Sequence, residues 1–177
     1  MFLDTRRCYL RELSLSDLDD VEFMLKEEDF GYTFSHEFSD EDIKKWIQDN
    51  INTYETKGLG MMAIILKEDD SFIGQAGLIK KDLDGNQVLD MICFLKKKYR
   101  KKGYGIETCK ALRAYAFDQL KVDKLYSFIR DENTLAKNIA KKLDMHPIKS
   151  VNVTLYSQSL IQEVFVIDKE KYEKNCL

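Results

Sequence analysis

The chain of 177 residues is poor in the residue types that mark several classes of protein. It has one proline and two histidines, and its four cysteines, Cys8, Cys93, Cys109 and Cys176, form no CxxC pair. This disfavours a zinc module, so we expect no metal site. The sequence contains no apolar run of membrane-spanning length, and its first residues lack the apolar core of a secretory signal. Without an export signal or a disulfide framework, a cytoplasmic protein is expected.

An excess of charge of either sign is also lacking. The 28 basic and 31 acidic residues give a formal net charge of −3. Nucleic-acid and membrane-surface binders usually carry a strong basic excess, so we expect neither partner. Hydrophobic residues make up 44% of the chain, which is enough to build a core. No repeat or linker interrupts the pattern, and residues 1–177 are predicted to form a single domain.

Hydrophobic periodicity predicts a mixed α/β fold. Alternating or short apolar runs indicate strands at residues 5–13, 60–66, 72–79, 88–95, 124–129, 151–156 and 160–167. Apolar residues spaced by three and four indicate helices at 18–25, from near Ser39 to Gly58, at 106–120 and at 133–143. Ser16-x-x-Asp19 resembles a capping box at the first of them. The segment from 95 to 124, strand then helix then strand, is long enough for a parallel crossover connection.

The segment from Arg100 to Gly105 carries the clearest chemical signal. It lies between an apolar strand and an amphipathic helix and reads Arg-Lys-Lys-Gly-Tyr-Gly. Gly103 and Gly105 leave room for a ligand to approach the backbone, and the N–H groups at a helix start favour an anion. Lys101 and Lys102 add positive charge. The segment is therefore predicted to bind phosphate.

The spacing of this segment excludes two common phosphate loops. A Walker A loop needs GxxxxGK(S/T) and a Rossmann turn needs GxGxxG, and neither is present. Arg-x-x-Gly-x-Gly instead resembles the pyrophosphate signature of the GCN5-related N-acetyltransferase (GNAT) family. Further segments resemble its branch of ribosomal-protein N-terminal acetyltransferases, in the family's order: 46–47, 58–66, 72–78, 99–107, 115–117, 132–134 and 142–143.

The resemblance implies a GNAT-like fold, with a twisted mixed sheet of six or seven strands, helices on both faces, and a splayed parallel pair that admits acetyl-CoA. It implies that the backbone of Phe94 and Leu95 pairs with the pantetheine arm and that Asn133 reaches the same arm. Asn133 would also suit an N-cap. The pyrophosphate would be held by the amides of the glycine turn, which are those of Arg100, Lys101, Lys102, Gly103, Tyr104 and Gly105. Ile106 would lie at the edge of the same contact.

Acetyl transfer to an amine needs a base and a donor to the oxyanion. Asp90 stands where this branch commonly has Glu, on an apolar strand that favours a raised pKa, and is the expected base; an exposed aspartate without a role is the alternative. The backbone N–H of Leu95 is the expected oxyanion donor, again by resemblance. Cys93 on the same strand has no partner constellation and is interpreted as a packing residue.

The chain departs from the family pattern at four positions. Lys101 stands where the motif often has Gly, Ala136 where Ser is common, and Asp144 where Gly is usual. Asp144 can adopt a left-handed conformation at a helix end. Ala140 stands where many relatives have a tyrosine general acid, so this residue cannot protonate the thiolate.

These considerations leave two functions open. The first is an acetyl-CoA-dependent N-acetyltransferase acting on a primary amine, either a protein N-terminus or a small molecule, as a monomer or a homodimer. The second is a non-catalytic acyl-CoA-binding or regulatory domain on the same fold. The aromatic segment 30–38, which includes His36, would line the acceptor cleft by resemblance, although ordinary helix packing also explains it.

Overall fold

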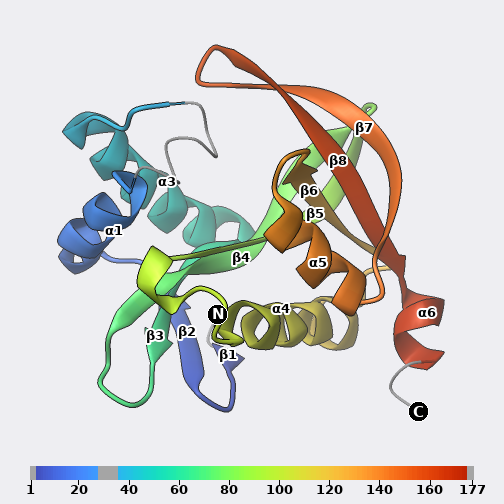
Figure 1. Ribbon diagram of the computed structural model, residues 1–177, viewed down its shortest axis with the longest axis horizontal. Helices are drawn as coiled ribbons and strands as arrows, with labels where there is room; N and C mark the ends of the chain where they lie inside the picture. Colours follow the sequence, from blue (N-terminus) through green and yellow to red (C-terminus); the bar gives the residue numbers. More distant parts are fainter. Residues whose placement is uncertain (1–2, 28–35, 175–177) are drawn as a thin grey trace.

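The computed structural model describes residues 3–27 and 36–174, which form one eight-stranded mixed sheet (Figure 1). The strands lie in the order β1-β2-β3-β4-β5-β6-β8-β7. Their bounds are Leu3–Asp4 (β1), Cys8–Glu12 (β2), Gly60–Leu66 (β3), Phe72–Leu83 (β4), Asn86–Leu95 (β5), Lys124–Arg130 (β6), His146–Leu155 (β7) and Gln158–Asp168 (β8).

Five helices accompany the sheet in the described ranges. Their bounds are Leu18–Leu25 (α1), Asp40–Lys57 (α3), Tyr104–Ala114 (α4), Thr134–Lys142 (α5) and Lys169–Lys174 (α6). A π-helical turn, Tyr115–Gln119, continues α4. None of these helices is both long enough and apolar enough to cross a bilayer.

The helices cover both faces of the sheet and create two hydrophobic cores (Figure 1). On one face, α1 and α3 pack their apolar stripes, including Val21 and Ile47, against Ala63 and Ile65 of β3. On the other face, α4 contributes Leu112 and α5 contributes its C-terminal end to the larger core. The buried strands β3 and β4 supply residues to both cores because their side chains alternate between the faces.

The parallel strands β5 and β6 diverge, and this divergence positions the site. They are in register at one pair of residues, Asp90 and Tyr126. Beyond this pair, β5 continues to Leu95 along β4, whereas β6 continues to Arg130 along β8. The strands therefore form a wedge whose apex is at Asp90 and whose arms end at Leu95 and Arg130.

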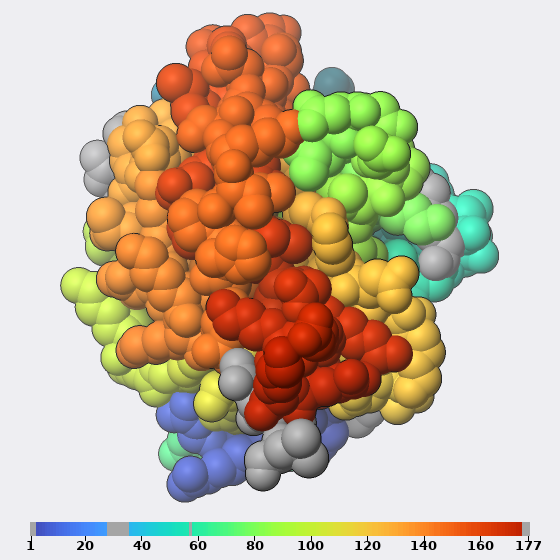
Figure 2. Space-filling model, turned by 90° about the vertical axis from the view of Figure 1, so that its right-hand side faces the viewer, coloured from blue at the N-terminus to red at the C-terminus, as the bar shows by residue number. Residues whose placement is uncertain are grey.

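The long hairpin of β7 and β8 forms the edge of the sheet opposite β1. Figure 2 shows β7 in orange, and β8 with α6 in red, beside the green β4–β5 hairpin. Lys149 of β7 forms an ion pair with Asp84 in the β4–β5 turn. At the other end, the ring of Tyr156 stacks on His36, with 4.0 Å between the ring centroids. The hairpin therefore reaches across to the segment that precedes α3.

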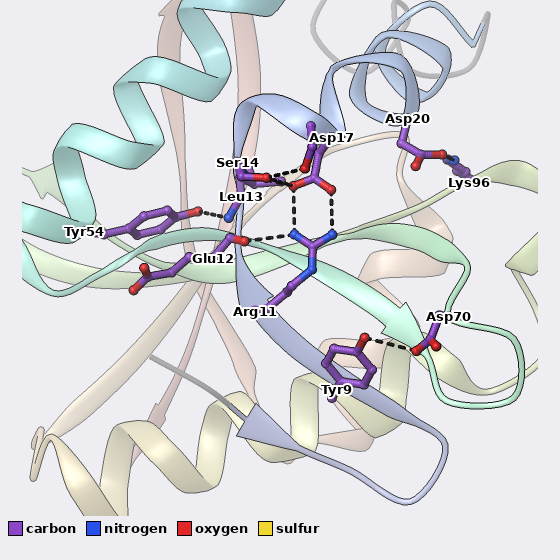
Figure 3. A network of polar contacts seen from close by, with 11 residues as sticks. Tyr9, Arg11, Glu12, Leu13, Ser14, Asp17, Asp20, Tyr54, Asp70 and Lys96 are labelled. Atoms are coloured by element: carbon purple, nitrogen blue, oxygen red, sulfur yellow. Dashed lines mark hydrogen bonds and ion pairs between the residues drawn. The ribbon is translucent and has the colours of Figure 1, made fainter.

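A network of polar contacts joins β2 to the start of α1 (Figure 3). Arg11 donates two hydrogen bonds to the carboxylate of Asp17, from Nη1 to Oδ2 (2.8 Å) and from Nη2 to Oδ1 (2.6 Å). Asp17 also accepts the backbone N–H of Ser14, which completes a capping box. Burial raises the pKa of Asp17, but the hydrogen bonds from Arg11 and Ser14 outweigh it and leave the pKa below its ordinary value.

The structure confirms the α/β class and the GNAT-like arrangement, with two differences in detail. The sheet has eight strands instead of six or seven, because the two-residue strand β1 is too short to show alternation in the sequence. The capping box at the first helix pairs Ser14 with Asp17 and lies two residues before the predicted Ser16 and Asp19. The capping of α3 by Ser39 agrees with the predicted helix start.

Candidate active site

A cavity of about 600 Å³ opens between the diverging strands, the start of α4 and one side of α5. Its volume lies within the range of small-molecule sites, about 300–1,000 Å³. Eight of the eleven residues predicted for the site line it: Phe94, Leu95, Arg100, Lys101, Gly103, Gly105, Ile106 and Asn133. The other lining residues are Cys93, Arg130, Glu132, Leu135, Ala136, Asn138, Ile139 and Lys142. The remaining cofactor residues of the prediction, Lys102 and Tyr104, and the expected base Asp90 do not line the cavity.

The glycine turn forms one wall and begins α4. Gly103 is the N-cap of α4 and has φ +87°, a conformation that side chains rarely adopt. A Cβ atom placed there would lie 3.1 Å from Nη2 of Arg7. The first N–H groups of a helix have no intrahelical partner, so those that follow Gly103 are free to bind a ligand. Lys101 has φ +61°, which explains why a glycine suits this position.

The backbone of β5 presents alternate residues to the open edge of the wedge. The N–H of Lys96 donates to the carbonyl oxygen of Ile73, next to β4 (2.9 Å). Backbone groups of successive strand residues point to opposite edges, so the N–H of Leu95 points away from β4. The same alternation directs the backbone groups of Phe94 toward Gln75, its partner on β4. Of the two residues expected to pair with the pantetheine arm, Phe94 and Leu95, only Leu95 therefore directs its N–H to the open edge.

Other parts of the protein hold Arg100, Lys102 and Tyr104 of the turn. Nε of Arg100 donates to the carbonyl oxygen of Leu95 (2.8 Å), and its Nη2 lies 3.4 Å from Oε2 of Glu27. The carbonyl oxygen of Lys102 accepts from Nη1 of Arg7 (3.0 Å). Tyr104 lies under the guanidinium of Arg7, 4.3 Å from the ring centroid to Cζ. Lys102 and Tyr104 thus hold the turn from outside the cavity.

The opposite wall of the cavity is α5, of which the predicted site residues include only Asn133. Asn133 caps the helix, because its Oδ1 accepts the N–H of Ala136 (3.0 Å). Ala136, Ile139 and Lys142 follow at helical spacing on the same wall. The helical period is visible in the sequence, but the sequence alone does not show which face of the helix borders the cavity.

Asp90 lies at the apex of the wedge. It is 1% exposed, and its Oδ1 accepts the backbone N–H of Phe128 (3.2 Å). Nζ of Lys81 lies 3.8 Å from its Oδ2. Burial raises the pKa of Asp90 to about 7, although Lys81 and the Phe128 N–H both favour the charged form. The alternative expected Asp90 to be exposed, and in this respect it is wrong, because Asp90 is buried.

Two other residues discussed from the sequence lie close to the cavity. Cys93 packs against the larger core, and it also lines the cavity. Its hydrogen bond with Cys109 and its burial raise its pKa, so this thiol is a weak nucleophile. Ala140 is 3% exposed and packs in the larger core, while its neighbours on α5 line the cavity.

The segment expected to line the acceptor cleft falls partly outside the described residues, which exclude 28–35. Of the rest, His36 contacts Phe38 and Tyr156 through its ring and Asp42 through Nε2 (3.2 Å). Phe38 is buried in the smaller core. These contacts agree with a packing role and place the tip of the β7–β8 hairpin beside the start of α3.

The family follows from comparison with known proteins. The family model described as "Acetyltransferase (GNAT) domain" matches residues 7–146. The chain therefore belongs to the GNAT acetyltransferase family, whose members typically use acetyl-CoA. Solved structures with the same fold include a GNAT-family acetyltransferase from Bacillus anthracis, with a TM-score of 0.80 and 18% identity, covering 96% of this chain and 99% of that one.

Another structure of this fold is RimL, described as a ribosomal L7/L12 alpha-N-protein acetyltransferase in complex with coenzyme A. Its TM-score is 0.77 at 13% identity, covering 95% of this chain and 98% of RimL. Among curated relatives, the uncharacterized N-acetyltransferase YnaD of Bacillus subtilis is 24% identical over 82% of both chains. The uncharacterized protein YkkB of Bacillus subtilis is 24% identical over 61% of this chain, and the match spans 63% of its own length.

Proposed function

We propose that this chain transfers the acetyl group of acetyl-CoA to a primary amine, either a protein N-terminus or a small molecule. The observation that carries the proposal is that the glycine turn of α4 and the open edge of β5 border one cavity. A diphosphate at the turn and an extended amide chain along the strand edge would both be satisfied there. Acetyl-CoA combines these two groups in one molecule.

The residues present fit such a ligand. Gly103 has φ +87°, and a Cβ there would lie 3.1 Å from Nη2 of Arg7, so the turn favours a residue without a side chain at this point. Amides of the segment from Arg100 to Ile106 would hold the pyrophosphate, aided by the charge of Lys101 at the cavity wall. The N–H of Leu95 would bind the amide or thioester carbonyl at the open edge. Asn133 would contact the pantetheine arm from the other wall.

The chemistry requires a neutral amine. Its nitrogen attacks the thioester carbonyl carbon, the carbon–sulfur bond breaks, and coenzyme A leaves with the sulfur. The N–H of Leu95 would stabilise the oxyanion. Asp90 would take the proton of the ammonium, directly or through a water molecule, and its pKa of about 7 matches this task. A thiolate is a good leaving group, so Ala140 in place of a tyrosine need not prevent turnover.

A second function is a domain that binds acyl-CoA without transferring the acyl group. The observation that favours it is the buried Ala140, which leaves that position of α5 without an acid. Both functions require the same cavity. They differ in whether thiol is released when an amine is supplied.

One experiment separates the two. Purified protein is mixed with acetyl-CoA and a panel of peptides and small amines, and free thiol is measured over time. We expect amine-dependent release, its loss in Gly103→Glu, and a fall of about 10²-fold or more in Asp90→Asn. Calorimetric binding of acetyl-CoA with no release on any amine would favour the regulatory domain. Absence of heat with both acetyl-CoA and coenzyme A would refute both functions.

A further inference from the structure

Lys81 of β4 lies next to Asp90 on the face of the sheet covered by α3. In the ladder of β4 and β5, Ile79 is opposite Asp90 and Lys81 is opposite Val88. Residues directly opposite share a face, so Lys81 and Asp90 are diagonal neighbours on it. Nζ of Lys81 lies 3.8 Å from Oδ2 of Asp90.

The ammonium of Lys81 is fixed by two further strands. It donates to Oε1 of Gln162 on β8 (2.9 Å) and lies 4.0 Å from the centroid of the Phe128 ring on β6. A side chain that begins on β4 therefore spans β5 and β6 at the apex of the wedge. Its side chain is 22% exposed, and burial lowers the pKa of Lys81, an effect that Asp90 opposes.

The free energy of ionising the buried carboxyl group of Asp90 depends on the few groups that contact it. Ionising a buried carboxyl costs free energy unless hydrogen bonds or an opposite charge compensate. On β6, the partner of Asp90 is the N–H of Phe128, and the residue in register with it is Tyr126. On β4, the partner is Lys81, the one charged group in the described residues that acts appreciably on the pKa of Asp90.

We infer that Lys81 is a positioning residue for the base: its ammonium keeps the Asp90 carboxylate ionised and turned toward the wedge, where the amine proton must be accepted. The inference rests on the proposed function. It assigns Lys81 a role distinct from a stabilising ion pair, because loss of the ammonium shifts the pH at which Asp90 can accept a proton. Acetyl-CoA binding, which uses the other end of the wedge, is unaffected.

The test compares Lys81→Met with Lys81→Gln, Lys81→Arg and the matched control Lys80→Met. Lys80 is the exposed neighbour on the other face of β4. The pKa of Asp90 is measured by carbon-13 NMR of labelled aspartate carboxyls, with Asp90→Asn used for assignment. The pH profile of kcat/KM for the amine is measured at saturating acetyl-CoA.

Removal of the charge by Met or Gln is expected to raise the pKa of Asp90 by about one unit. This lowers kcat/KM about tenfold at pH 6 and restores it near pH 9. Lys81→Arg and Lys80→Met should resemble the wild type, and all variants should bind acetyl-CoA alike. An unchanged Asp90 pKa in both neutral variants would overturn the inference while transfer persists. If neither the wild type nor any variant acetylates an amine, the proposed function is refuted, and the inference with it.

Discussion

Arg7 and Glu107 join the start of the chain to the first turn of α4. Nε of Arg7 donates to Oε2 of Glu107 (2.7 Å), and the backbone N–H of Arg7 donates to Oε1 (2.7 Å). Thr5 adds a hydrogen bond to Oε1. Burial raises the pKa of Glu107, but these hydrogen bonds outweigh it, so the pKa is below its ordinary value and the carboxylate is ionised at neutral pH.

The first prediction concerns Arg7. Because Arg7 also holds the carbonyl oxygen of Lys102, Arg7→Ala should release the glycine turn and weaken acetyl-CoA binding about tenfold, measured by calorimetry. The exposed neighbour Arg6 provides the control, since Arg6→Ala removes the same charge without touching the turn. Equal loss in both variants would show that only the charge of this segment matters.

A second prediction separates backbone strain from ligand contact at the glycine turn. Gly103 (φ +87°) and Gly85 (φ +81°) have similar conformations, but a Cβ at Gly85 meets nothing within 4 Å. Alanine at either position should reduce the free energy of unfolding by about 1–2 kcal/mol. Only Gly103→Ala should weaken acetyl-CoA binding. Full binding by Gly103→Ala would contradict a close approach of the ligand at this point.

The pH dependence of turnover provides a third prediction. The pKa of Asp90 is raised to about 7, and a base acts only in its ionised form. The wild-type kcat/KM for the amine should therefore rise with pH through about 7, provided that the amine itself is neutral at those pH values. An acceptor with a weakly basic amine satisfies this condition. Asp90→Asn should lack this rise; a retained inflection near 7 would assign it to another group.

The fourth prediction concerns the end of α5. Asp144 has φ +63°, as anticipated for a helix end, and its Oδ2 lies 3.3 Å from Nη1 of Arg113. Asp144→Gly loses the partly exposed ion pair but relieves the left-handed strain, so its stability should be within about 1 kcal/mol of wild type. Asp144→Ala loses the ion pair and keeps the strain, so it should be the least stable. Denaturant unfolding gives the order.

A fifth prediction uses the pair of Arg11 and Asp17 in Figure 3. Since the pKa of Asp17 is lower in the folded protein than its ordinary value of 3.8, the pair stabilises the fold above that value and stops doing so as the pH falls through the lowered pKa. Asp17→Asn should lower the free energy of unfolding by about 1–3 kcal/mol at pH 7. The difference from wild type should shrink as the pH falls below 3.8. Asp19→Asn, at an exposed position in α1, should show neither effect.

The elements with strong periodicity could be predicted from the sequence, and the small ones could not. The helix from Ser39 to Gly58 and the β3–β4–β5 meander follow directly from apolar spacing and turn residues. The strand β1 has two residues and is defined only by its pairing with β2, which is a tertiary event. The capping box was misplaced because Ser14 and Ser16 are both followed three residues later by an aspartate.

The part of the candidate site formed by the backbone of the glycine turn could be predicted from the sequence. Glycines before a helix indicate an anion site, and eight of the predicted residues do line the cavity. The roles of Arg7 and Lys81 could not be read from the sequence, because each acts on a residue brought close only by folding. Arg7 lies 100 positions from Glu107, and the Lys81 ammonium acts across β5 and β6. Contacts of this kind leave no local pattern.

The order of the last three strands has a consequence for synthesis of the chain. β8 lies between β6 and β7, although β7 precedes it in the sequence. While the ribosome has released the chain only as far as Leu155, β7 has no neighbour to pair with, and the exposed edge of β6 has no cover. Assembly of this half of the sheet must therefore await the segment from Gln158 to Asp168.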